Sequence, residues 1–354
     1  NKLTTGLLCT DKDRHLSDTD SCFFIGEIDG ILYSSSGNAI YNFVSAQSGN
    51  TELQKKGTGY HGSGSERTAY LLCMLWMKYA TKNSQKVFQG CTGFNIQTKV
   101  VQTGENVNYV VIPTAQANSF YVGTTVSIGD ATGHTDNLDR GQAYMRNIAD
   151  KVKITAIEAI SGTDNSRVYV GKQNMTITED TYISSMPLHA GQTDKVLGVD
   201  GYVKNDGKHA FKLGGIEDMV GVYYISMNEL WNKTTATTVD YYVRGTAAWS
   251  STATNWTKIA TVDLETTDDF WIGDIDIDLS TGVIWFKSKG SGDSVGVGDR
   301  QYNGGDGTGW REALRRGLLW NGSNAGFSYA NLRNDVTNAN WNYALCFYMS
   351  DGTK

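Results

Sequence analysis

The ratio of glycine to proline constrains the fold of this chain more than any other feature. Its 354 residues include 40 glycines and only 2 prolines. Glycine at this frequency is typical of tight turns, and 40% apolar residues are enough to bury a sizeable core. We therefore expect a folded protein rich in strands and loops, arranged as one large domain or as two to three ordinary ones.

Charge and cysteine usage exclude several classes of partner. The net charge of −6 and the pI near 5.4 argue against non-specific binding to nucleic acid. The longest apolar run, Ala69–Met77, is too short to cross a bilayer, so we expect no membrane insertion. Five widely spaced cysteines fit neither a disulfide framework nor a zinc site. They indicate reduced, buried thiols in a protein made in a cytoplasm.

Two regions have clear secondary-structure patterns. Ser65–Lys82 predicts a helix with Ser65 as its N-cap, and its apolar residues run nearly all round, which favours burial in a core. From about Val107 to Met186, short β-type runs alternate with Gly, Asp and Asn turns. The alternation beginning at Val152, followed by a polar turn and the run RVYV, predicts a hairpin. We interpret this region as a small β module inserted into a larger domain.

Motifs that carry chemistry are weak throughout. Gly57–Gly62 matches GxGxxG but lacks the preceding apolar strand of a dinucleotide site, so a turn is favoured. Asp274–Asp278 places acids at alternate positions, which indicates a solvated strand face more often than a cation site. Glu217 and Asp218 are adjacent and point differently, and the five histidines are scattered singly. We therefore expect neither catalysis nor a bound metal or cofactor.

The C-terminal segment has the composition of a contact surface. Between Trp320 and Tyr343 lie seven asparagines and five aromatic residues, with no lysine or proline. Asparagine and glycine at this density favour turns over helix or regular strand. Asparagine, serine and tyrosine with a few larger aromatics also characterise antibody paratopes. The segment is therefore expected to present side chains to a ligand.

Four blocks of sequence support a family resemblance. They are KGTGYHGSGSERTAYLLCMLWMKYATKNSQ, GQTDK, GGIEDMVGVYYISMNELW and DGTGWREALRRGLLWNGSNAGFSYANLRNDVTNANWNYALCF. Together they resemble C-type-lectin-fold proteins of the formylglycine-generating-enzyme type, and most of all phage tail and virion proteins diversified by diversity-generating retroelements. The resemblance implies an α+β, C-type lectin-like fold. It divides the chain into an N-terminal part (1–105), an inserted β-rich module (106–186) and a C-terminal part (187–354) with a variable segment at 318–348.

The resemblance further implies that the chain is a phage tail adhesin that binds a host cell-surface receptor, either a protein or a glycan. It would be made in the bacterial host cytoplasm, reside in the virion as a homotrimer, and contact other tail proteins. Variation in such proteins arises at AAY codons, which reach every residue except Met, Trp, Lys, Gln and Glu. The implied ligand-binding residues are Leu318, Trp320, Ser323, Phe327, Tyr329, Asn331, Arg333, Asp335, Tyr343 and Phe347.

Among the aromatic residues of this segment, we expect Phe327, Tyr329 and Tyr343 to be displayed, because they alternate with Asn, Ser and Gly. Trp310 and Trp341 are expected in the core. Trp320, which an AAY codon does not reach, is read as a scaffold residue or a fixed contact.

Two alternatives remain open. One is a structural virion or baseplate subunit whose C-terminal fold makes only assembly contacts. The other is an oxidase of the formylglycine-generating type, which uses a pair of active-site cysteines to hold copper. The C-terminal third contains only Cys346, so that activity is not expected. The EPN and WND motifs of calcium-dependent lectins are also absent from the sequence.

Overall fold

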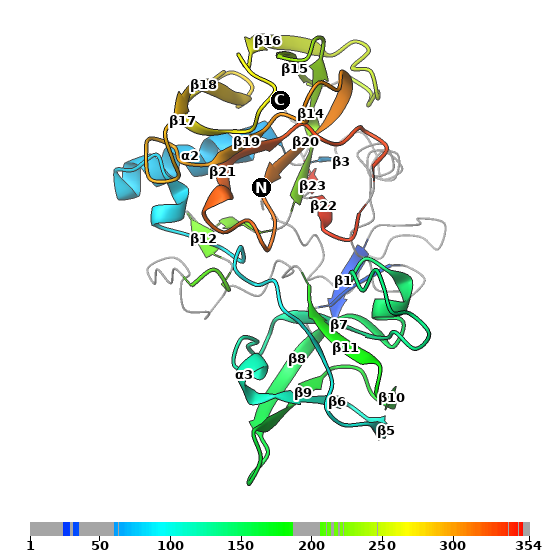
Figure 1. Ribbon diagram of the computed structural model, residues 1–354. Coiled ribbons are helices and arrows are strands. Elements are labelled where there is room, and N and C mark those ends of the chain that lie inside the picture. Colours follow the sequence, from blue (N-terminus) through cyan, green and yellow to red (C-terminus); the bar gives the residue numbers. More distant parts are fainter. Residues whose placement is uncertain are drawn as a thin grey trace.

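The computed structural model describes the backbone of 24–28, 31–34 and 60–62 and most of the chain from residue 64 onward, with gaps at 187–205, 210, 214–215, 219, 222, 246, 339, 346 and 350–354. Figure 1 shows two groups of strands, one of them carrying the main helix. Among the described residues, four short strand pairs lie outside the two large sheets. Three of them are β1 (Phe24–Ile28) with β2 (Ile31–Ser34), β5 (Gly104–Val107) with β10 (Met175–Ile177), and β12 (Phe211–Leu213) with β13 (Ile216–Asp218).

The smaller sheet has six strands in the order β4-β11-β7-β8-β9-β6. Its strands are β4 (Gln97–Lys99), β6 (Tyr109–Pro113), β7 (Thr125–Asp130), β8 (Ala149–Ala159), β9 (Asn165–Val170) and β11 (Thr181–Ser185). The predicted hairpin is confirmed, because β8 and β9 pair antiparallel across residues 160–164. The smaller sheet has its own hydrophobic core. Apolar side chains of its six strands and of adjacent residues form this core, together with the short helix α3 (Thr114–Ala117). This sheet begins at Gln97, upstream of the boundary predicted at residue 106.

The larger sheet has nine strands and carries the C-terminal segment. Its main path runs β16-β15-β14-β20-β21-β19-β17-β18, and β22 adds to β14. The strands are β14 (Tyr223–Lys233), β15 (Thr238–Val243), β16 (Thr257–Asp263), β17 (Phe270–Ile277), β18 (Ile284–Gly290), β19 (Arg300–Tyr302), β20 (Gly309–Arg316), β21 (Gly326–Asn331) and β22 (Tyr343–Leu345). Near the end of the chain, β23 (Phe347–Met349) pairs instead with β3 (Tyr60–Gly62).

Helix α2 (Ser65–Tyr79) packs on the larger sheet, and Gly64 rather than Ser65 occupies its N-cap position. Leu71, Leu72 and Leu75 join the core of this sheet. The expectation of burial all round is wrong, because Met77 is 74% exposed and Tyr70 is 43% exposed. The helix therefore covers the sheet with one face only, as an amphipathic surface helix does.

The α+β, C-type lectin-like fold expected from the resemblance is wrong for this chain. The structure is mostly β, with curled sheets and a near-barrel, and the described residues contain only two α-helices, α2 and α3. The physical reason is the pattern of apolar and turn-forming residues along the sequence. Outside α2, apolar residues come in short runs bounded by Gly, Asn and Asp turns, and such runs form strands.

The two large sheets meet at a small apolar contact. Met186, at the end of the smaller sheet, packs with Leu319 and Trp341 from the C-terminal segment. The Arg140 guanidinium lies 5.3 Å from the centroid of the Trp341 ring and donates to the Ser185 carbonyl. The C-terminal segment is thus fixed from both sheets.

Candidate functional site

The C-terminal segment divides into buried anchors and exposed side chains. The anchors are at most 4% exposed and comprise Leu318, Phe327, Tyr329, Asn331 and Tyr343. Of the other predicted ligand-binding residues, Trp320, Ser323, Arg333 and Asp335 are exposed. The backbone of Phe347 belongs to β23, and its side chain lies outside the described part of the chain.

The expected display of Phe327, Tyr329 and Tyr343 is wrong. Strand β21 lies between β20 and β19 inside the larger sheet, and all six of its residues are buried. The Phe327 ring packs 5.2 Å from the Phe211 ring in the core beneath α2. Alternation with small and polar residues, which suggested display, here reflects a strand covered on both faces. The placement of Trp341 in the core is confirmed, and Trp310 is partly buried against Tyr242.

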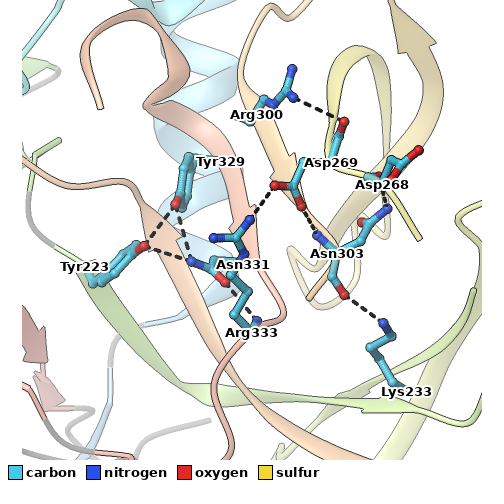
Figure 2. Close-up of polar contacts among 9 residues, drawn as sticks. All are labelled: Tyr223, Lys233, Asp268, Asp269, Arg300, Asn303, Tyr329, Asn331 and Arg333. Atoms are coloured by element: carbon cyan, nitrogen blue, oxygen red, sulfur yellow. Dashed lines mark hydrogen bonds and ion pairs between the residues drawn. The ribbon is translucent and has the colours of Figure 1, made fainter. Parts of the chain in front are cut away.

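A buried polar network fixes the end of β21. The Tyr223 and Tyr329 hydroxyls lie 3.1 Å apart, and Asn331 Nδ2 donates to the Tyr223 hydroxyl at 2.8 Å. Burial, together with the neighbouring Tyr223, holds the pKa of Tyr329 well above its usual range, so both phenols stay neutral hydrogen-bonding groups. Asn331 Oδ1 accepts from the Arg333 backbone N–H at 2.8 Å. This network sets the direction in which Arg333 leaves the sheet (Figure 2).

Beside this network, arginines and aromatic rings from three elements share one surface. Trp271 of β17 and Arg300 of β19 are paired across the strands, and Tyr302 is two residues further along β19, on the same face. The Arg300 guanidinium lies 4.9 Å from the Trp271 ring centroid, and that of Arg333 lies 4.8 Å from the Tyr302 ring centroid. We call Trp271, Arg300, Tyr302 and Arg333, with Asp269 between the arginines, the arginine–aromatic surface.

Asp269 connects both arginines of this surface. Its carboxylate Oδ2 accepts from Arg333 Nη2 at 2.5 Å, and its backbone carbonyl accepts from Arg300 Nη2 at 3.1 Å. The other carboxylate oxygen accepts from the Asn303 backbone N–H at 2.9 Å. Asn303 is held in turn by Lys233, whose Nζ donates to the Asn303 carbonyl at 2.7 Å (Figure 2). Asp269 is therefore bonded to a residue that is itself buried and fixed.

Among the described side chains of the C-terminal segment, Trp320 is the most exposed aromatic residue. Its side chain is 44% exposed, and its ring lies 5.7 Å from the buried Trp341 ring at an angle of 47°. Ser323, in the adjacent short 3-10 helix Gly322–Asn324, is exposed as well. An exposed aromatic ring that rests on a buried one loses little conformational freedom on binding, which favours a contact role.

The larger sheet also buries two charged clusters. Arg315 Nη2 bonds Glu229 Oε2 at 2.7 Å, and both side chains are at most 3% exposed. Asp299 accepts from the Ser328 backbone N–H at 2.7 Å, and burial raises its pKa to about 8 in spite of this bond and of nearby Arg316. Groups this deep in the core do not meet a ligand, and we assign them to the scaffold.

The acidic run on β17 is accounted for by lysines and turns. Asp274 pairs with Lys82 at 2.7 Å, and Asp276 pairs with Lys287 at 3.1 Å. Asp278 accepts from Ser280, whose side-chain and backbone bonds lower the pKa of this carboxyl. Within the described ranges, no three His, Cys, Asp or Glu side chains are grouped as metal ligands. In the same part of the chain, no helix has the length and apolar character needed to span a bilayer.

Comparison with protein-family models and with curated proteins finds no match to this chain. The site therefore rests on its own geometry. Sequence reasoning identified Trp320, Ser323, Arg333 and Asp335 but missed Asp269, Trp271, Arg300 and Tyr302. For Arg300 and Tyr302 a signal was present in the alternation of residues 300–302, which places an arginine and an aromatic on one strand face. Asp269 and Trp271 had no such signal.

Proposed function

We propose that this chain is a receptor-binding adhesin of a phage tail, and that it contacts its ligand through the exposed side chains of the C-terminal segment. One observation carries the proposal. In this segment, exposed Trp320 and Ser323 precede the buried strand β21, and exposed Arg333 and Asp335 follow it. A rigid support that presents aromatic and arginine side chains is what a binding hot spot requires. The choice of a phage tail adhesin among binding proteins comes from the sequence resemblance of the segment and not from a C-type lectin-like fold.

The proposed adhesin performs no chemistry on its ligand. It resides in the virion, contacts other tail proteins and binds a receptor on the host surface. We further propose a homotrimer as the functional unit. Three linked copies of a weak site raise the overall affinity through effective concentration, without any new contact in the single site. A diversified segment is compatible with such an assembly, because the anchors that hold it are buried in each copy.

The test is adsorption to host cells by a variant that changes exposed positions only. We choose Ser323→Ala, Arg333→Ala and Asp335→Asn together, because asparagine at 335 keeps an acceptor for the Thr337 backbone N–H. The variant should keep the parent's melting temperature within a few degrees, since surface changes cost about 0.5 kcal/mol each. It should lose at least about tenfold in adsorption, since loss of hot-spot side chains typically costs 2 kcal/mol or more.

A matched control carries the same three chemical changes on the smaller sheet. Ser161→Ala, Asp164→Asn and Arg167→Ala alter side chains at or beside the β8–β9 hairpin, remote in sequence from the C-terminal segment. This control should adsorb as the parent does. Equal adsorption by the parent, the control and the C-terminal variant would refute the proposed binding segment and favour a structural virion subunit.

A further inference from the structure

The arginine–aromatic surface holds two guanidinium groups against one residue. Arg300 and Arg333 come from different elements, yet both donate to Asp269, one to its carbonyl and the other to its carboxylate. Each guanidinium also lies on an aromatic ring, Trp271 or Tyr302. Stacking fixes the planes of the two groups before any ligand arrives. Because less side-chain entropy is then lost on binding, the pair is preorganised.

Both arginines keep hydrogen-bond donors for a ligand. A guanidinium carries five N–H donors in one plane. Among the described residues, the hydrogen bonds of Arg300 and of the Arg333 side chain all leave from Nη2. Because the ring covers a face of each group, the remaining donors point outward from its edge. Edges of this kind match carboxylate and phosphate oxygens, which accept two parallel N–H bonds.

The charge of the surface is suited to an anion as well. The charged groups of this surface are two arginines and one carboxylate, that of Asp269, which bonds Arg333, so the surface has one positive charge in excess. The Arg333 side chain is 53% exposed, and exposed ion pairs of this type contribute little to stability. An incoming oxyanion therefore bonds Arg333 in place of the Asp269 carboxylate, or together with it, at a small cost in free energy. The chain as a whole carries −6, so polyanions are not attracted to it in general.

We propose that Arg300 and Arg333 together bind an oxyanion on an acidic cell-surface polymer, either a sugar carboxylate or a phosphate. This inference rests on the proposed adhesin function and assigns its ligand class. Asp269 keeps the two arginines in place while the site is free and competes with the ligand for Arg333. Binding weakens with rising salt, because exposed charges are screened.

The experiment measures equilibrium binding of three immobilised polymers to the full chain. Polygalacturonate offers carboxylates, poly(glycerol phosphate) offers phosphates, and dextran is neutral. We expect one of the two acidic polymers to bind, which identifies the source of the oxyanion, and dextran not to bind. Arg300→Gln should weaken that binding at least about tenfold, as loss of charge-assisted hydrogen bonds does. Asp269→Asn should strengthen it, because a competing carboxylate is removed.

Arg167→Gln is the matched control, since Arg167 lies 5.3 Å from the centroid of the Tyr109 ring without a second arginine described beside it. It should bind like the parent. Arg300→Lys keeps the charge but loses the planar fork, and we expect binding between that of the parent and that of Arg300→Gln. The proposal is overturned if Arg300→Gln binds like Arg167→Gln, if Arg300→Lys binds like the parent, or if neither acidic polymer binds.

Failure of this inference is distinguishable from failure of the adhesin proposal, because polymer binding is measured on Arg300→Gln, which leaves Ser323, Arg333 and Asp335 unchanged, and host adsorption is measured separately. Loss of adsorption in that variant without binding of either acidic polymer would refute the oxyanion site and leave the adhesin standing. Binding of an acidic polymer that depends on Arg300, combined with normal adsorption of that variant, would support the oxyanion site and refute the adsorption role of the C-terminal segment.

Discussion

Phe327 and Trp320 belong to the same C-terminal segment, and the structure gives them opposite roles. The Phe327 side chain is fully buried and that of Trp320 is 44% exposed. Phe327→Ala should lower the free energy of unfolding by about 3–5 kcal/mol, as other buried large-to-small aromatic changes do. Trp320→Ala should lower it by about 0.5 kcal/mol, the usual scale for a surface change. Denaturant unfolding of both variants checks this difference, and equal losses would show that the burial assignment is wrong.

Asp299 makes the stability of the protein depend on pH. Burial raises its pKa to about 8 in the folded state, while an exposed Asp titrates near 3.9. Between these values the folded state keeps a proton that the unfolded state has lost. The stabilisation that protonated Asp299 contributes to the folded state is therefore fully present below about pH 4, and it is lost as the pH rises through about 8.

Asp299→Asn tests this dependence, since asparagine has the same shape and keeps an acceptor for the Ser328 N–H. Unfolding free energies measured at about pH 5 and about pH 9 should differ less in this variant than in the parent. An unchanged difference between the two pH values would place the titrating group elsewhere.

At the scale of elements, the sequence predicted those helices and strands that interactions between neighbouring residues determine. The β8–β9 hairpin followed from alternation and a polar turn, and α2 followed from the apolar residues along Ser65–Lys82, although its N-cap is Gly64 and not Ser65. Long-range pairing decided the rest. Strand β21 looks like an exposed segment in sequence, and only its place between β20 and β19 explains why Phe327 and Tyr329 are buried.

The candidate site also depends on long-range strand pairing that local sequence does not predict. Arg333 was found because it lies in a segment of unusual composition. Asp269, Trp271 and Arg300 of the same surface lie in or beside strands β17 and β19, which sheet pairing brings next to β21. No short-range pattern records that arrangement, because the strands involved are separated along the chain and β19 pairs with β21 in parallel.

At the scale of the whole molecule, two sheets hold one C-terminal segment. Trp341 packs with Met186 and lies beside Arg140, both from the smaller sheet's side of the chain, and its ring also lies beside that of Trp320. Helix α2 covers a separate face of the larger sheet and leaves Met77 74% exposed. The molecule therefore offers two solvent-exposed reporter side chains, Trp320 in the proposed binding segment and Met77 outside it.

Hydroxyl-radical labelling of these two reporters tests most directly whether the C-terminal segment contacts the receptor. Both side chains are accessible in the free protein, so both should be oxidised there. After adsorption to purified host envelope, oxidation of Trp320 should fall several-fold, about as expected when a hot-spot aromatic loses its contact with water, while oxidation of Met77 stays unchanged. Equal oxidation of Trp320 in the free and adsorbed protein would contradict the proposed binding segment.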